Sequence, residues 1–444
     1  MHDGPRVPQE LSDLIISHLE DSKSALAACS LVSRAWTVTS QRLLFQSITL
    51  KVHRPRHRAV GRHDPITYIH EFVHFVSEDC PHLRSWVFDV SIRYTGILDA
   101  GNQRPILPIP LIEGLLSSLP HLRSLSLTSF DLLLDRHTPS SPSANAEKTR
   151  LGRLLLLDNI TVESATISTI EPSSARPFLA LLHLFSHIDN LYVSQFYGDW
   201  WNTYDLTLPD SNSSGNIPPT TVNRLCIQHV RDMDLLLEIF GRSLDLSSVT
   251  DFAFTITDIQ DLYAIAIFVS DARTRIVNLE LDLVDYSGSD EWIQMSSDAF
   301  RWMESLTMHI KVHKELIYNQ MISDTILVAL SRIKDDNPDP SPLSSFSIFV
   351  YPEIADYKTQ LLEYIEWGSI SEALEGFDHL GQVSIGVREI DDGWVSRSDD
   401  VTVEESSGEE WNECRNKLKL EFVRLGPKVT VDVESERRAY WKTL

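Results

Sequence analysis

One short motif of the sequence has the residue types and spacing of a catalytic centre. His70, Glu71 and His74 form the pattern HExxH, in which two histidines one helical turn apart bind zinc and the glutamate activates water. Apolar residues at helical spacing between positions 66 and 76 predict an amphipathic helix, which would place both histidines at the edge of its apolar face. A zinc hydrolase that uses these three residues is therefore one function to consider.

The surroundings of the motif favour an ordinary packing helix instead. The residue three past His74 is Ser77, where the extended zinc-protease pattern has a glycine. The sequence also has no glycine-rich phosphate loop and no GxSxG nucleophile elbow. We therefore predict no metal ligands, no catalytic residues, no cofactor and no enzymatic activity, with the zinc hydrolase as a remote alternative.

Composition and charge narrow the remaining functions. The chain has 444 residues, and its 63 acidic and 39 basic residues give a formal net charge of −24. A field of this sign opposes binding to nucleic acid or to anionic membranes, so neither is expected as a partner. The four cysteines form no CxxC pair, the first residues lack the apolar core of a signal peptide, and no apolar run approaches the roughly 20 residues that span a bilayer. The expected location is the cytoplasm or the nucleus.

Residues 7–50 are predicted to form a module of three short helices. Pro8 suits a first helical turn, where its missing N–H costs nothing, and Glu10 suits the positive end of the helix dipole. Asp21, Ser22 and Ser24 offer caps for the second helix. Apolar residues recur at helical spacing at Leu11, Leu14, Ile15, Leu19, Leu26, Cys29, Val32, Trp36, Leu43, Leu44, Phe45 and Ile48. So small a module cannot bury enough surface alone, so it needs either the rest of the chain or another protein as a partner.

The order of residues in this module resembles the F-box, particularly in its fungal form. The resemblance rests on Val7-Pro8 and Glu10, on Ala25-Leu26 and Ala28-Cys29, on Leu31-Val32-Ser33-Arg34 with Trp36, and on Leu44-Phe45. The family usually has leucine where Val7 stands.

The resemblance to the F-box implies docking onto the Skp-type adaptor of a cullin–RING ubiquitin ligase. In that family the proline-containing start and the apolar faces of the first two helices make the contact. Carried over by position, the expected contact residues are Pro8, Leu11, Ile15, Leu19, Leu26, Val32 and Trp36. The alternative is that these helices only cap the open end of the next domain in the chain, and Trp36 belongs equally well to the core.

The following four hundred residues contain a recurring motif, apolar-x-x-apolar-x-apolar. The apolar pattern alone is weak evidence for a repeat, because a chain with this many apolar residues produces it often by chance. The spacing of the copies and the residues around them are stronger evidence. HLRSWVFDV and HLRSLSLTS are near-copies, each after a proline, and residues 151–159 match LxxLxLxxN in full. The ten copies are Leu83/Trp86/Phe88, Leu122/Leu125/Leu127, Leu151/Leu154/Leu156, Ile188/Leu191/Val193, Val222/Leu225/Ile227, Val249/Phe252/Phe254, Ile276/Leu279/Leu281, Met303/Leu306/Met308, Leu343/Phe346/Ile348 and Leu380/Val383/Ile385.

This pattern resembles a degenerate leucine-rich-repeat array over residues 66–390, in which each unit pairs one parallel strand with one helix. The expected fold class is α/β, with the helical module followed by an irregular leucine-rich-repeat-like solenoid. The alternative is a set of smaller α/β domains. Residues 391–410 form an acidic loop, and residues 411–444 are predicted to form a C-terminal helix–strand cap.

Residues 51–65 are expected to link the module to the array. Positions 51–63 carry five lysines and arginines and no acid, which fits either a solvated connection or a local site for an acidic or phosphorylated partner. Together these features predict a non-catalytic ligase adaptor whose repeat surface holds an unknown target protein. The alternative is a structural or interaction solenoid outside any ligase.

Overall fold

The computed structural model describes residues 8–52, 66–95, 104–133, 160–168, 175–196, 219–271, 276–283, 302–312, 316–335, 342–352, 365–388, 408–426 and 430–436. The chain divides into two compact units, Met1–Thr221 and Val222–Leu444, which we call unit 1 and unit 2. The basic segment 53–65 and most of the acidic loop, residues 391–407, lie outside the described residues.

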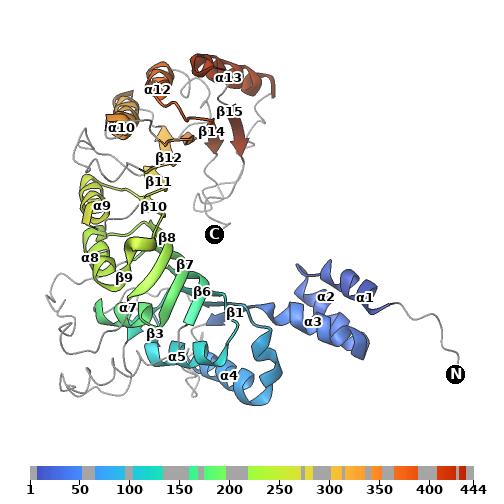
Figure 1. Cartoon of the computed structure of the whole chain (residues 1–444). Coiled ribbons are helices and arrows are strands. Elements are labelled where there is room, and N and C mark those ends of the chain that lie inside the picture. The colour runs from blue at the N-terminus through green and yellow to red at the C-terminus, as the bar shows by residue number, and fades with distance from the viewer. Residues whose placement is uncertain are drawn as a thin grey trace, which may run out of the picture. The chain divides into compact units, whose positions relative to one another are not determined.

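Unit 1 begins with the three predicted helices, drawn in blue in Figure 1: α1 (Gln9–Ser17), α2 (Lys23–Val32) and α3 (Arg34–Gln46). Serine side chains cap the N-termini of α2 and α3. Ser22 accepts a hydrogen bond from the Ala25 N–H at 3.4 Å, and Ser33 accepts one from the Trp36 N–H at 3.3 Å. The third helix ends two residues before Ile48, the last apolar position of the predicted helical pattern. It ends at Gln46, and Ile48 belongs to strand β1 (Ser47–Val52), whose β-branched residues favour a strand.

A parallel sheet forms the rest of unit 1. Its strand order is β1, β2 (Asp89–Tyr94), β4 (Ser124–Thr128), β6 (Ile160–Ser168) and β7 (Phe185–Ser194). The helices α4 (Thr67–His74), α5 (Ile109–Ser118) and α7 (Ala175–Leu182) lie on one side of these strands (Figure 1). A π-helical turn η1 (Phe75–Asp79) and a 3-10 helix η2 (Pro81–Ser85) follow α4, and β3 (Ile106–Pro108) pairs with β5 (Asp131–Leu133) in a small separate sheet.

Unit 2 repeats the same arrangement. Its parallel strands follow the order β8 (Thr220–Gln228, whose first two residues belong to unit 1), β10 (Asp251–Thr255), β11 (Asn278–Leu283), β12 (Ser305–Val312), β13 (Ser345–Pro352), β14 (Gln382–Arg388) and β15 (Thr430–Glu436). The helices are α8 (Met233–Ser243), α9 (Ile259–Asp271), α10 (Leu316–Asp335), α12 (Trp367–Leu374) and α13 (Gly408–Glu421), with the short β9 (Leu244–Asp245), η4 (Leu246–Ser248) and η7 (Val423–Leu425). The unit ends with α13 and β15, and α13 starts three residues before position 411, where the sequence places the start of the C-terminal helix–strand cap.

The strand registers confirm the predicted repeat in eight of its ten copies. Leu225, Phe252, Leu279 and Leu306 lie opposite one another on successive strands at 27-residue intervals, and each is at most 2% exposed. Phe346 and Val383 continue this row on β13 and β14. The apolar positions of the motif thus form the buried face of each sheet, and the fold is an α/β array of the leucine-rich-repeat type in each unit.

The first predicted copy has the wrong register. Val90 and Ile92 of β2, not Trp86 and Phe88, lie opposite Leu125 and Leu127. The near-identical HLRS sequences therefore do not align in space, because η2 takes up residues 81–85 before β2 begins. The copy at residues 151–159 lies outside the described residues, and β6 supplies Ala165 and Ile167 in its place.

Main-chain hydrogen bonds connect neighbouring repeats at the start of the strands. Two consecutive N–H groups donate to one carbonyl of the preceding repeat, as Val277 and Asn278 do to the Thr250 carbonyl at 2.9 and 3.1 Å. Glu304 with Ser305, and Gly381 with Gln382, repeat the arrangement. These bonds satisfy polar backbone groups at the point where each strand begins.

Candidate partner-binding face

The N-terminal module builds a small core from its three helices. Ile16 of α1 and Leu26 of α2 are both fully buried, and Thr39 of α3 donates a hydrogen bond of 2.6 Å to Asp13 of α1. The Lys23 ammonium group reaches the last turn of α3, where it donates to the carbonyls of Leu43 and Leu44 at 3.3 and 3.1 Å. A cation at this end of a helix is favourable because the final carbonyls have no partner within the helix.

Six other large apolar side chains of the module are exposed. They are Leu11 at 52%, Leu14 at 56% and Ile15 at 54% on α1, Leu31 at 87% and Val32 at 65% at the end of α2, and Val38 at 58% on α3. We call Leu11, Leu14, Ile15, Leu31 and Val32 the apolar face. So many large apolar side chains exposed within so few residues are characteristic of surfaces that bind another molecule.

The structure divides the sequence-predicted contact residues into three groups. Pro8, Leu11, Ile15 and Val32 are exposed, and Leu19 and Trp36 are half-buried. Leu26 is fully buried in the module's own core, so its side chain is not available to a partner. The helical pattern did not predict the burial of Leu26, because α2 is so rich in small residues that either of its sides can face the core.

Leu31 is a residue that the sequence prediction left out. It belongs to the Leu-Val-Ser-Arg stretch, of which the resemblance to the F-box predicts only Val32 as a contact residue. Its side chain is the most exposed of the large apolar side chains in the described residues. The sequence carried no clear signal for it, because adjacent apolar residues on a helix are often both buried, as Leu115 and Leu116 are on α5.

The three residues of the HExxH motif lie exposed on α4. The His74 Nδ1 lies 3.6 Å from Asp79 Oδ2 of η1, and both side chains are more than 60% exposed. Among the residues that the structure describes, no three His, Cys, Asp or Glu side chains come together as a group that would hold a metal ion. The helix packs through Ile69, which is buried, as the prediction of a packing helix requires.

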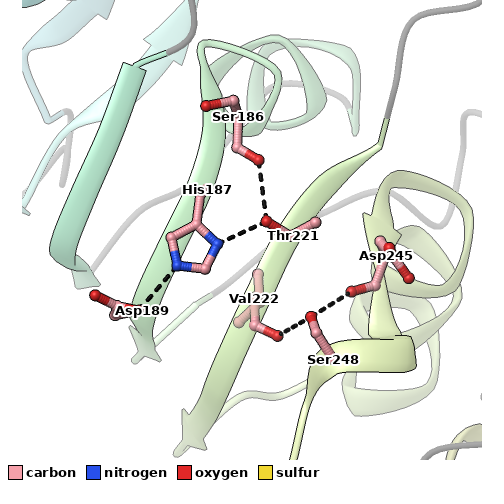
Figure 2. Close-up of polar contacts among 7 residues, drawn as sticks. All are labelled: Ser186, His187, Asp189, Thr221, Val222, Asp245 and Ser248. Atoms are coloured by element: carbon pink, nitrogen blue, oxygen red, sulfur yellow. Dashed lines mark hydrogen bonds and ion pairs between the residues drawn. The ribbon is translucent and has the colours of Figure 1, made fainter.

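A hydroxyl, an imidazole and a carboxylate also meet in unit 1, as Figure 2 shows. The Thr221 hydroxyl lies 2.6 Å from His187 Nδ1, and His187 Nε2 lies 2.8 Å from an oxygen of Asp189. The same hydroxyl donates to the Ser186 carbonyl at 3.2 Å, and the neighbouring Thr220 donates to the Leu182 and Phe185 carbonyls. These bonds anchor the chain at the start of β8, so we assign the cluster a structural role.

Burial shifts the pKa of several groups outside the module. Burial raises the pKa of the Asp261 carboxyl, which accepts hydrogen bonds from the Thr257 N–H and hydroxyl at 2.9 and 2.7 Å at the start of α9. Burial, together with the Glu280 carboxylate, raises the pKa of the Cys226 thiol to about 12. Burial lowers the pKa of His183. Each of these groups lies in a packed part of the fold, and none forms a reactive centre with a second shifted group.

Among the helices of the described ranges, none combines the length and apolarity that crossing a bilayer requires. No protein-family model matches the chain, and neither does any curated protein. Among solved structures, the chain is similar to a chain of the crystal structure of the Rad7 and Elc1 complex in yeast. The identity is 11%, the alignment covers 95% of this chain and 92% of that chain, and the TM-score is 0.33. A TM-score this low carries no information on function.

Proposed function

We propose that this protein is the substrate-recognition adaptor of a cullin–RING ubiquitin ligase of the SCF type. Its N-terminal module would dock on the Skp-type adaptor, and its repeat array would hold a target protein. The observation that carries the proposal is the apolar face, formed by side chains that the helical core leaves exposed on α1 and at the end of α2. The resemblance of the same residues to the F-box supplies the partner.

The mechanism requires no reactive side chain in this chain. Two binding sites on one protein hold a target close to the enzyme that transfers ubiquitin, and this raises the effective concentration of the target there. Leu11, Ile15 and Val32 keep their proposed contact roles, with Pro8 and the half-buried Leu19 and Trp36 at the edge of the interface. Leu31 joins them as a further contact residue, and Leu26 supports the contact from inside the module.

The alternative, a module that only caps the repeats, predicts that the apolar residues of α1 and α2 pack against the first strand. Leu11 and Ile15 are more than half exposed, which favours docking over capping. A zinc hydrolase built on His70, Glu71 and His74 remains a separate alternative, and zinc analysis of the purified protein tests it directly.

The decisive experiment is a titration of the purified Skp-type adaptor with the full chain and two double variants. Leu11→Asp with Leu31→Asp places two charges on the apolar face, and we expect binding to weaken by about 30-fold or more. The matched control is Leu420→Asp with Val423→Asp, because these apolar side chains are 67% and 65% exposed at the C-terminal helix. Failure of the folded wild type to bind the adaptor would reject the proposal, and so would equal weakening by the control.

A further inference from the structure

The proposed function leaves the two histidines of α4 without a role. His70 and His74 lie four residues apart within this helix, so their side chains are neighbours on one of its faces. Both residues are exposed, whereas Ile69 is buried and packs the helix against the core. Among the residues that the structure describes, none forms a hydrogen bond or an ion pair with the His70 side chain. The packing of unit 1 therefore does not explain why two histidines stand here.

A π-helical turn at the end of α4 brings a carboxylate to the second histidine. The turn, η1, is wider than an α-helical turn, so the residue five positions past His74 returns to the same face. That residue is Asp79, whose Oδ2 lies 3.6 Å from His74 Nδ1. The Ser77 hydroxyl donates to the Ser118 hydroxyl at 3.1 Å and holds the turn against α5. Turns of this kind are rare in proteins, and those that occur are often at functional sites.

Two imidazoles one helical turn apart are a bidentate ligand set for a divalent transition-metal ion. Imidazole nitrogen suits Zn²⁺, Ni²⁺ and Cu²⁺, whereas Mg²⁺ and Ca²⁺ prefer oxygen ligands. The Asp79 carboxylate beside Nδ1 of His74 favours the tautomer with its proton on that nitrogen, which leaves the Nε2 lone pair for a metal. A carboxylate in this position is common behind metal-bound histidines, because it orients the ring.

We propose that His70 and His74 bind one Zn²⁺, Ni²⁺ or Cu²⁺ ion as a two-histidine chelate on the surface of unit 1. Within the described part of the chain, no third His, Cys, Asp or Glu completes a metal-binding group, so water fills the other coordination positions. A zinc-hydrolase centre differs in two respects, because it takes a third protein ligand and uses the glutamate of the motif as a base. Binding at the chelate is therefore reversible and independent of Glu71.

Calorimetric titration of the full chain tests the chelate. The protein is first dialysed against a chelator and then titrated with NiCl₂ and, separately, with ZnCl₂. Excess MgCl₂ in each titration occupies oxygen sites on the acidic surface without competing for imidazole. We expect the wild type to bind one more ion than the variant His70→Gln with His74→Gln. Each single variant should weaken binding at this site by about tenfold or more, because a chelate needs both nitrogens.

The matched control, His18→Gln with His379→Gln, replaces two exposed histidines elsewhere in the chain and should keep the site. Equal numbers of bound ions in the wild type and in the α4 double variant would overturn the proposal. A single variant of His70 or His74 that binds as the wild type does would overturn it as well. Glutamine favours a helix more than histidine does, and thermal unfolding checks that the double variant is folded. The single variants replace it if it is not.

Two further measurements separate the chelate from the other functions considered for this chain. Glu71→Gln should bind the metal ion as the wild type does, because Glu71 is not a ligand of the chelate. Loss of binding in this variant, or zinc that stays on the wild type through dialysis against the chelator, would reject the two-histidine site in favour of a tighter centre. The variant His70→Gln with His74→Gln should still bind the Skp-type adaptor, because neither residue belongs to the apolar face. The metal site and the ligase function can thus fail independently.

Discussion

At the scale of single residues, the hydroxyl of Ser40 is buried in the helical module and has no hydrogen-bond partner among the residues that the structure describes. An unpaired polar group costs roughly 1–3 kcal/mol, and alanine also favours a helix more than serine does. We therefore expect Ser40→Ala to raise the free energy of unfolding by about 1 kcal/mol. Urea denaturation measures the change, with Ser17→Ala as the control, because Ser17 is exposed on α1 and its hydroxyl is already bonded to the Leu14 carbonyl. A lower stability of Ser40→Ala would show that its hydroxyl is satisfied in solution.

Cys226 makes stability depend on pH in the alkaline range. Burial, followed by the Glu280 carboxylate, raises the thiol's pKa from an ordinary 9.0 to about 12 in the folded chain. Between these two values the unfolded chain releases a proton that the folded chain retains, so the thiol's contribution to stability is complete below pH 9 and is lost as the pH rises toward 12. The urea midpoint of the wild type should fall more steeply from about pH 8 to about pH 10 than that of Cys226→Ala. Parallel slopes for the two proteins would contradict the shifted pKa.

At the scale of elements, Gly386 of β14 lets the ring of Phe349 lie over the neighbouring strand. A Cβ at Gly386 would lie 2.3 Å from the ring carbon Cδ1 of Phe349, which also stacks on His309 with ring centroids 5.0 Å apart. Because the ring is packed on both sides, Gly386→Ala should destabilise unit 2 by about 1–3 kcal/mol. Gly381→Ala is the control, since its nearest neighbour would be the Ser344 carbonyl at 3.8 Å. Thermal unfolding of both variants measures the difference, and equal effects would mean that Phe349 moves aside freely.

The sequence predicted the repeat strands best where the repeats have equal length. Leu225, Phe252, Leu279 and Leu306 follow one another at 27 residues, and their registers agree with the prediction. The prediction was wrong for the copy that contains Trp86, because the sequence pattern does not show how many residues a short 3-10 helix occupies before a strand. The motif did not predict strands β1 and β6. Helix α3 continues directly into β1, and β6 has Ala165 at a position where the motif has a large apolar residue.

The candidate site was predicted only in part, for a related reason. Helical periodicity groups apolar residues on a face, but it does not say whether that face meets the protein's own core or a partner. In α1, Ile16 is buried while its neighbour Ile15 is exposed, and in α2 the predicted contact residue Leu26 is the buried one. Neighbours on adjacent strands are likewise hidden in the sequence, because residues such as Lys51 and Arg93 come together only through the register of β1 and β2.

At the scale of the whole molecule, two properties of the chain oppose each other when no partner is present. The apolar face on α1 and α2 favours association between copies of the chain, because burying it removes apolar surface from water. The net charge of −24 opposes association, since every approaching copy carries the same sign. Salt weakens the second effect much more than the first, because screening shortens the reach of surface charges from about 10 Å at 0.1 M to about 3 Å at 1 M.

This balance predicts that the free chain self-associates as salt is added. Sedimentation velocity should show mainly monomer in about 0.1 M NaCl and a growing fraction of larger species in about 1 M NaCl. Leu11→Asp with Leu31→Asp should stay monomeric at both concentrations, whereas Leu420→Asp with Val423→Asp should behave as the wild type. Saturation with the Skp-type adaptor should suppress the effect in the wild type, because the adaptor covers the same side chains. A wild type that stays monomeric at the higher salt concentration would show that the apolar face is too small or too divided to drive association by itself.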